Sequence, residues 1–180
     1  HCFDDTLKVG EYPAVVLFID KDADVMVIQV PRLSRPALHP ASKDAEIGQS
    51  VAAFGFGYGF EWPQLLTGIV SNKDVQISYY DDGMLVTLPG VWTITDFPVI
   101  HGQSGGPVVD KNGRVVSLVQ IGTDEIGAGR SLSLLLSLTR SCRSAVSVQN
   151  LRLIGFVRSP TRLKGLRSPS LTMHRLPSAR

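Results

Sequence analysis

The chain has 180 residues, of which 43% are hydrophobic and 19% charged, with a formal net charge of +2. This composition is typical of one globular domain and excludes a collagen, a coiled coil and a wholly disordered chain. No stretch reaches the roughly 18 to 20 uninterrupted apolar residues that cross a bilayer as a helix, so we expect no membrane span.

Charge is distributed unevenly along the chain. Residues 1–125 hold all 16 acidic residues and 8 basic ones, whereas residues 126–180 hold 10 basic residues and no acidic one. A basic tail can contact nucleic acid or an anionic membrane. The only aromatic residue of this tail is Phe156, so it lacks the interleaved aromatic side chains that stack on bases. We therefore expect no nucleic-acid partner.

Residues 13–130 read as short β-strands separated by turn residues, without a long segment of helical periodicity. Residues 31–45 contain three prolines. We expect this segment to be a connection and not a strand, because proline is excluded from the interior of a sheet. The segment 107–119 predicts a hairpin in which Asn112-Gly113 supplies the positive φ angles of a tight turn. The other predicted strands cover residues 14–19, 25–30, 50–56, 65–71, 75–80, 84–88 and 92–95.

This spacing of short strands indicates an all-β sandwich or barrel. Further along, residues 130–136 read as one last strand and residues 135–146 as a helix. Beyond about Gly155 the content of Ser, Pro and Arg predicts disorder. The two tryptophans, Trp62 and Trp92, are interpreted as packing residues.

The window His101–Val109 carries the strongest chemical signal. In it, Ser104 is flanked by Gly102, Gly105 and Gly106. Glycine lets the backbone approach a substrate carbonyl closely and permits the φ and ψ angles that turn successive N–H groups toward one point. An isolated Ser-Gly-Gly would be read as a Gly-rich turn. The additional fixed residues favour a nucleophile beside an oxyanion hole.

With these residues the sequence resembles the trypsin-like serine proteases, whose nucleophile lies in Gly-x-Ser-Gly-Gly-Pro. The segment Gly102–Pro107 matches that motif at every fixed position. His1-Cys2 resembles the end of the family's Thr-Ala-x-His-Cys segment, and Asp24–Val30 is similar to the Asp-Leu-Ala-Leu-Leu-Lys-Val strand of the HtrA/Deg branch. Residues 48–55 and 66–71 are also similar to that branch. The resemblance covers about residues 1–136.

The resemblance implies two antiparallel six-stranded β-barrels. Residues 1–45 would be the remnant of the amino-terminal barrel with the interbarrel connection, and residues 46–137 the carboxy-terminal barrel with the nucleophile loop. Residues 138–180 would be a short helix followed by a disordered basic tail. In this family the catalytic histidine follows the first strands of the first barrel, so we expect a chain that begins at His1 to be a fragment with an incomplete first barrel and little activity. We also expect no peptide-binding PDZ module after the protease body.

The resemblance also implies a catalytic triad. Ser104 would be the nucleophile, His1 the general base and Asp24 the residue that orients the base, while the N–H groups of Gly102 and Ser104 would form the oxyanion hole. His39, His101 and His174 are alternative bases, but of the four histidines His1 alone precedes Asp24 as the fold requires. The implied substrate is a polypeptide, with no cofactor or metal, and the implied location is outside the cytoplasm or in an organelle.

Two departures from trypsin concern the substrate pocket and activation. Gln103 replaces the aspartate that pairs with a new amino terminus in trypsin, so activation by trimming is not expected. Pro98 stands where trypsin has its acidic pocket floor, which favours an uncharged, small or medium apolar residue before the scissile bond. Asp96 is an alternative pocket acid. The residues expected to line the pocket are Pro98, Val99, Ile100, Leu118, Val119 and Gln120.

Two other functions fit parts of the pattern. Gly102–Gly106 also matches the nucleophile elbow of α/β-hydrolases, with Ser104, Asp124 and His174 in the required order. That elbow must run from a strand into a helix, which the predicted hairpin contradicts. The second alternative is a catalytically impaired protease homologue that only binds peptides.

Overall fold

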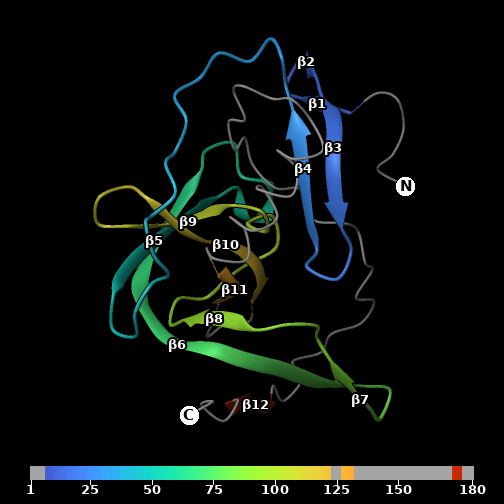
Figure 1. The fold of residues 1–180 in the computed structure, drawn as a ribbon, viewed down its shortest axis with the longest axis vertical. Coiled ribbons are helices and arrows are strands. Elements are labelled where there is room, and N and C mark those ends of the chain that lie inside the picture. The colour runs from blue at the N-terminus through green and yellow to red at the C-terminus, as the bar shows by residue number, and fades with distance from the viewer. Residues whose placement is uncertain (1–6, 123–126, 132–171, 176–180) are drawn as a thin grey trace.

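The computed structural model describes residues 7–122, 127–131 and 172–175 (Figure 1). The predicted all-β class is confirmed for this part of the chain, which contains strands and one short 3-10 helix. None of its helices could cross a membrane. The elements are β1 (Lys8–Val9), β2 (Tyr12–Pro13), β3 (Val15–Asp20), β4 (Val25–Gln29), β5 (Ser50–Gly55), η1 (Gly57–Gly59), β6 (Gln64–Asp81), β7 (Met84–Thr87), β8 (Trp92–Thr95), β9 (Pro107–Asp110), β10 (Val115–Gly122), β11 (Gly127–Ser131) and β12 (Thr172–Arg175).

Six strands form a closed antiparallel barrel. They pair in the order β6-β5-β9-β10-β11-β8, and β8 pairs back with β6, which closes the sheet. Along β5 the buried residues Val51 and Ala53 alternate with less buried ones, as expected of a strand with one face on a core. The largest buried cluster consists of Ala41, Ala45, Val51, Ala53, Val70, Phe97, Val99, Val108, Val116 and Val119.

Strand β6 differs from the prediction in length. The sequence predicts two strands, at 65–71 and 75–80, whereas the structure has one strand of 18 residues. Its pairing with β8 shifts register between Val70 and Asn72 and again before Val75, and Asp74 has a positive φ of 56°. Bulges of this kind bend a strand without ending it, so β6 contributes to both ends of the barrel sheet.

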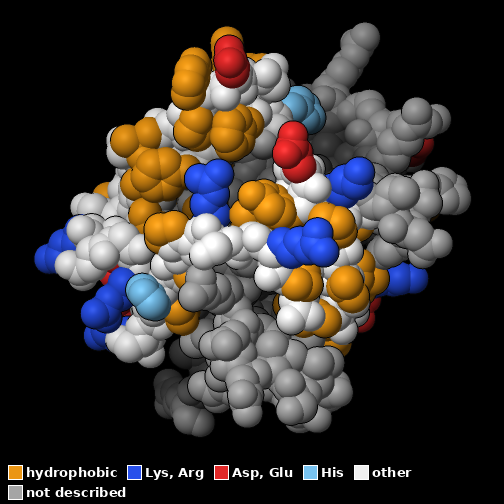
Figure 2. All heavy atoms as spheres, turned by 90° about the horizontal axis from the view of Figure 1, so that it is seen from above, with side chains coloured by type: hydrophobic (Ala, Val, Ile, Leu, Met, Phe, Trp, Pro, Cys, Tyr) orange, Lys and Arg blue, Asp and Glu red, His pale blue; other side chains and the backbone are white. Residues whose placement is uncertain are grey.

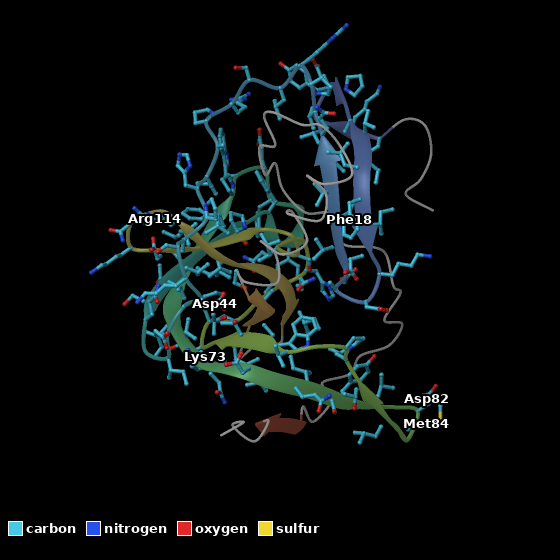
Figure 3. All side chains as sticks on the ribbon, viewed as in Figure 1. Phe18, Asp44, Lys73, Asp82, Met84 and Arg114 are labelled. Carbon is cyan, nitrogen blue, oxygen red and sulfur yellow. The ribbon has the colours of Figure 1, made fainter. Side chains whose placement is uncertain are left out.

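The β9–β10 hairpin is confirmed, but its turn differs from the prediction. Gly113 has a φ of +72°, while Asn112 is not in the left-handed region. The Asp110 carboxylate accepts hydrogen bonds from the N–H groups of Asn112 and Arg114, at 2.8 and 2.9 Å. These side-chain contacts stabilise a longer turn, with Arg114 at the outer tip of the hairpin (Figure 3).

The turn with two consecutive positive φ angles occurs elsewhere, in the β6–β7 hairpin. There Asp82 and Gly83 have φ values of 47° and 80°, and Asp81 pairs with Met84. This is the two-residue turn that Asp-Gly favours. Figure 3 shows Asp82 and Met84 at the end of the hairpin, away from the barrel.

The described residues of the amino-terminal part, from Leu7 on, form two small sheets, β1–β2 and β3–β4, rather than a second closed barrel. The β3–β4 hairpin stands beside the barrel (Figure 1). It contacts β10 through a small apolar cluster in which Ala23 and Val25 pack against Leu118, with Phe18 at the edge. The Pro-rich connection contains no strand, but it pairs with β10 at an isolated bridge between Pro40 and Val115, and its Ala41 and Ala45 belong to the core cluster.

Near the carboxy terminus the structure describes only β12. Its residues 172–175 pair antiparallel with β6, Thr172 lying opposite Ser78, in a region where the sequence predicts disorder. The predicted helix at 135–146 and the remainder of the predicted tail lie outside the described residues.

Candidate active site

The loop Gly102–Gly106 lies between β8 and β9. It turns through two backbone hydrogen bonds, from Gln103 to the carbonyl of Ile100 at 3.2 Å and from Gly106 to that of Gln103 at 3.0 Å. Gly102 and Gly105 have φ values of 98° and 86°, which L side chains rarely adopt. The glycines of the motif are therefore required by the loop's own conformation.

One flank of this loop packs against the backbone of residues 54–57. A Cβ atom on Gly102 would collide with the carbonyl oxygen of Phe56, and one on Gly106 with that of Phe54. The Tyr58 N–H also donates to the His101 carbonyl, at 2.6 Å. Glycine at 102 and 106 thus permits an approach that any side chain would prevent.

The other flank is held by β10. The Gly105 N–H donates to the carbonyl of Val119 at 2.6 Å, and the Val119 N–H donates to that of Gly106 at 2.9 Å. Ser104 is half-buried, and its Oγ donates to the carbonyl of Gln120 at a long 3.4 Å. The loop is therefore fixed on both sides, with Ser104 on the side of β10.

Two N–H groups of the loop are available to an acceptor. Within the described residues, neither the Gly102 nor the Ser104 N–H donates a hydrogen bond. Between Phe97 and Val109 the sequence contains no Asp, Glu, Lys or Arg. This segment therefore offers backbone donors beside Ser104 and no charged side chain of its own.

Asp24 lies in the turn between β3 and β4. Its φ is +52°, and the preceding residue is held by a hydrogen bond from the Ala23 N–H to the Asp20 carboxylate, at 2.8 Å. The amide of Gln120 donates to the carbonyls of Ala23 and Asp24, at 2.8 and 3.0 Å. Gln120 is thus hydrogen-bonded both to the turn of Asp24 and, through its backbone, to Ser104.

His1 lies outside the described residues, so the structure describes two of the three predicted triad residues. Among the alternative bases, His39 and His101 are exposed and contribute backbone carbonyls to hydrogen bonds with Val115 and Tyr58. His174 lies in β12, which pairs with β6, whereas the nucleophile loop connects β8 and β9. The described residues include no group of three or more His, Cys, Asp or Glu placed to bind a metal ion.

The residues predicted to line the pocket lie in different surroundings. Val99 and Val119 belong to the barrel core, while Leu118 belongs to the cluster with Ala23 and Val25. Neighbouring residues of a strand point to opposite faces, which separates Leu118 from Val119. Pro98 is exposed and Ile100 is half-buried.

Val99 also restricts the space beside two glycines. A Cβ atom on Gly122 or Gly127 would collide with the Val99 side chain. Asp96, the alternative pocket acid, accepts a hydrogen bond from the Ile69 N–H at 2.7 Å. Its carboxylate therefore has a structural partner on β6.

Gln103 is a structural feature whose role the sequence did not reveal. Its side chain is 1% exposed. Its Oε1 accepts from the Ile100 N–H at 3.1 Å, and its Nε2 donates to Gln64 Oε1 at 3.4 Å. The neutral amide thus holds the loop from inside.

The segment that supports the loop carries exposed aromatic side chains. Trp62 is 75% exposed, so its interpretation as a packing residue is wrong, whereas Trp92 is 2% exposed and the interpretation is confirmed. Figure 2 shows hydrophobic side chains gathered over part of one face. The exposed aromatic residues of this segment are Phe54, Phe56, Tyr58, Phe60 and Trp62.

The surroundings of Ser104 differ from a nucleophile elbow. The loop is followed by β9 and β10, which pair antiparallel. An α/β-hydrolase would place a helix there, on a parallel sheet. The α/β-hydrolase alternative is therefore wrong. Of its other two residues, Asp124 lies outside the described residues and His174 lies in β12.

Comparison with known proteins agrees with the fold and the motif. The serine protease Rv3671c of Mycobacterium tuberculosis is 33% identical over 121 residues, which cover 63% of this chain and 29% of that protein. A probable periplasmic serine endoprotease, DegP-like, of Chlamydia pneumoniae is 26% identical over 129 residues, covering 66% of this chain and 24% of that protein. The chain thus spans less than a third of the length of these curated relatives.

Solved structures share the fold. The active form of the Rv3671c protease matches with a TM-score of 0.59 and 24% identity, covering 77% of this chain and 60% of that one. The HtrA-type protease AlgW with a decapeptide matches with a TM-score of 0.61 and 20% identity, covering 74% and 41%. Residues 4–118, which include Asp24 and Ser104, match the trypsin-like peptidase domain. Because this match covers more than half of the chain, the protein belongs to the trypsin-like peptidase domain family.

Proposed function

We propose that the protein is a serine endopeptidase in which Ser104 is the nucleophile, His1 the general base and Asp24 the residue that orients the base. The observation that carries this proposal is the loop Gly102–Gly106, where a half-buried Ser104 lies beside two N–H groups without acceptors among the described residues. The hydrogen bonds that connect Gln120 to both Ser104 and Asp24 support the same assignment.

The proposed reaction follows from these roles. Ser104 Oγ attacks the scissile carbonyl while its proton passes to His1, and the N–H groups of Gly102 and Ser104 stabilise the oxyanion. Each such donor is worth roughly 3 to 4 kcal/mol in the transition state. His1 then protonates the leaving amine as the C–N bond breaks. A water molecule, deprotonated by His1, hydrolyses the acyl-enzyme and restores Ser104.

The proposed specificity is for an uncharged residue before the scissile bond. Residues 97–100 contain no charged side chain, and Val99 fills space beside Gly122 and Gly127. The Asp96 carboxylate is already bonded to the Ile69 N–H. Among the described residues, a cationic side chain there would therefore be desolvated without a counter-ion, which costs several kcal/mol.

The test is peptide hydrolysis by the protein in its full natural length. A peptide library is incubated with the wild type, with Ser104→Ala and with the matched control Ser42→Ala, an exposed serine of the connection. We expect cleavage after uncharged residues by the wild type and the control, and none by Ser104→Ala. Dominant cleavage after Lys or Arg would refute the specificity. Peptide binding without any cleavage would identify an impaired homologue instead.

A further inference from the structure

Gln120 makes an unusual set of contacts for a residue in the middle of a strand. Its side chain is 5% exposed. The Nε2 atom donates to the carbonyls of Ala23 and Asp24, at 2.8 and 3.0 Å, across about a hundred residues of sequence. An amide nitrogen has two N–H donors, and both have a partner in this turn.

The oxygen atom of the Gln120 amide, in contrast, is not hydrogen-bonded to any described residue. Its Oε1 is buried and has no hydrogen-bond partner among the described residues. Buried polar atoms without partners are rare, because each carries a desolvation penalty. Gln120 thus makes its two Nε2 hydrogen bonds despite a desolvation penalty that an apolar side chain of similar size would avoid, and such a side chain could not make those bonds.

The turn that receives these bonds is shaped by a local hydrogen bond, from the Ala23 N–H to the Asp20 carboxylate. Asp24 has a left-handed backbone, with a φ of +52°, a conformation that Asp adopts more readily than most residues other than glycine. The apolar contacts of Ala23 and Val25 with Leu118 hold the hairpin against β10. Such contacts are non-directional, so they do not fix the orientation of the Asp24 backbone.

The same short stretch of β10 holds the nucleophile. Val119 exchanges backbone hydrogen bonds with Gly105 and Gly106, and the Gln120 carbonyl accepts from Ser104 Oγ. Residues 119 and 120 therefore contact the Ser104 loop through their backbone and the Asp24 turn through one side chain. The Gln120 side chain is therefore a direct hydrogen-bonded connection between the Asp24 turn and the stretch of β10 that holds Ser104.

We propose that Gln120 is a positioning residue, which fixes the Asp24 turn relative to Ser104 and thereby orients the base. This inference rests on the proposed function, because it assigns Asp24 and Ser104 to one reaction. Gln120 acts through Asp24 rather than on the substrate. Since a misplacement of about 1 Å can cost roughly a hundredfold in rate, we expect its loss to reduce kcat much more than it raises KM.

The test replaces Gln120 by methionine in the protein of full natural length. Gln120→Met keeps the length and burial of the side chain and removes both N–H donors. Gln120→Asn keeps the amide but is shorter by one methylene. The matched control is Gln29→Met, at an exposed position of β4. Each variant is treated with a fluorophosphonate probe, whose P–F bond breaks as Ser104 Oγ bonds to phosphorus, fluoride leaving and the serine proton passing to the base.

The decisive readout is the pH dependence of the labelling rate. A nearby carboxylate raises the pKa of an imidazole because it favours the charged form. If Asp24 is displaced in Gln120→Met, the base loses its proton more easily, so the acid limb of the profile moves to lower pH while the plateau falls about ten- to a hundredfold. A residue that only supports the fold would lower the labelled fraction at every pH without moving the limb.

The outcomes separate the two proposals. Absence of labelling in the wild type, or an unaltered profile in Asp24→Asn, would contradict the proposed function itself. Normal labelling in the wild type with an altered profile in Asp24→Asn, but an unaltered one in both Gln120 variants, would overturn only the role of Gln120. Loss of cooperative thermal unfolding in both Gln120 variants would also overturn it, since Gln120 would then be a residue of the fold.

Discussion

The Oε1 atom of Gln103 accepts a hydrogen bond from the backbone nitrogen of Ile100, at 3.1 Å, within the loop that carries Ser104. The family resemblance places an ion-pairing aspartate at this position in trypsin, where a new amino terminus orders the loop. In this protein the loop is held by a neutral amide that is almost fully buried. In the structure the loop is thus held by hydrogen bonds of an uncharged side chain.

Replacing Gln103 by alanine should destabilise the protein and slow the labelling of Ser104. The substitution leaves the Ile100 N–H without its acceptor, which costs about 1 to 3 kcal/mol when the group is buried. Thermal unfolding and probe labelling are measured beside Gln29→Ala, at an exposed position. Equal melting temperatures and equal labelling rates for the two variants would show that the Gln103 side chain does not hold the loop.

Gly102 and Gly83 offer a comparison of two glycines with positive φ angles. Both lie in the left-handed region, at 98° and 80°, but a Cβ atom on Gly102 meets the Phe56 carbonyl whereas one on Gly83 meets nothing within 4 Å. Gly83→Ala should therefore cost only the conformational penalty, about 1 to 2 kcal/mol. Gly102→Ala should in addition displace an oxyanion donor and slow labelling by about a hundredfold. Similar labelling rates in both variants would contradict the assigned role of Gly102.

The two tryptophans should differ strongly in their contribution to stability. Trp92 packs in the cluster with Val75, Ile77 and Ile94, whereas Trp62 is exposed. Truncation of a buried aromatic residue to alanine costs about 3 to 5 kcal/mol, while a surface substitution costs about 0.5 kcal/mol or less. Denaturant unfolding of Trp92→Ala and Trp62→Ala measures both values. A comparable loss for Trp62→Ala would mean that its side chain is covered in the natural protein.

The Asp110 turn should make part of the stability depend on pH. The pKa of the Asp110 carboxyl is lowered, chiefly because it accepts a hydrogen bond from the Arg114 backbone. A carboxylate whose folded pKa lies below its unfolded value, about 3.9 for Asp, contributes stability above that value and loses it as the pH falls through the folded pKa. The difference in unfolding free energy between the wild type and Asp110→Ala should therefore shrink between pH 7 and pH 3. A constant difference would contradict this linkage.

Local sequence patterns were sufficient to predict most of the strands and to identify the nucleophile motif. The β-branched run predicted at 25–30 forms the strand Val25–Gln29, and the segment 92–95 forms a strand as predicted, because alternation and propensity act within a few residues. The same reasoning divided β6 into two strands, since Asn72 and Asp74 are common turn residues. In the barrel, pairing on both sides keeps the chain extended through a bulge.

Contacts between distant segments were beyond sequence reasoning. The bonds from Gln120 to Ala23 and Asp24 join residues about a hundred positions apart, and no local pattern predicts them. The predicted pocket took Leu118, Val119 and Gln120 together, although consecutive strand residues face opposite sides. In the structure Val119 packs in the barrel core, Leu118 packs against the β3–β4 hairpin, and Gln120 donates hydrogen bonds to that hairpin. This separation arises because β10 lies between the barrel core and the hairpin.

The central claim is that Ser104 is an activated nucleophile served by Asp24. The most direct measurement is to map the fluorophosphonate adduct by mass spectrometry in the protein of full natural length, in the wild type, Ser104→Ala and Asp24→Asn. The account predicts one adduct, on the peptide that contains Ser104. It should be absent in Ser104→Ala and form at least about a hundredfold more slowly in Asp24→Asn, because the base is no longer held in the required tautomer. An adduct on another serine, no adduct in the wild type, or a rate unaffected by Asp24→Asn would contradict it.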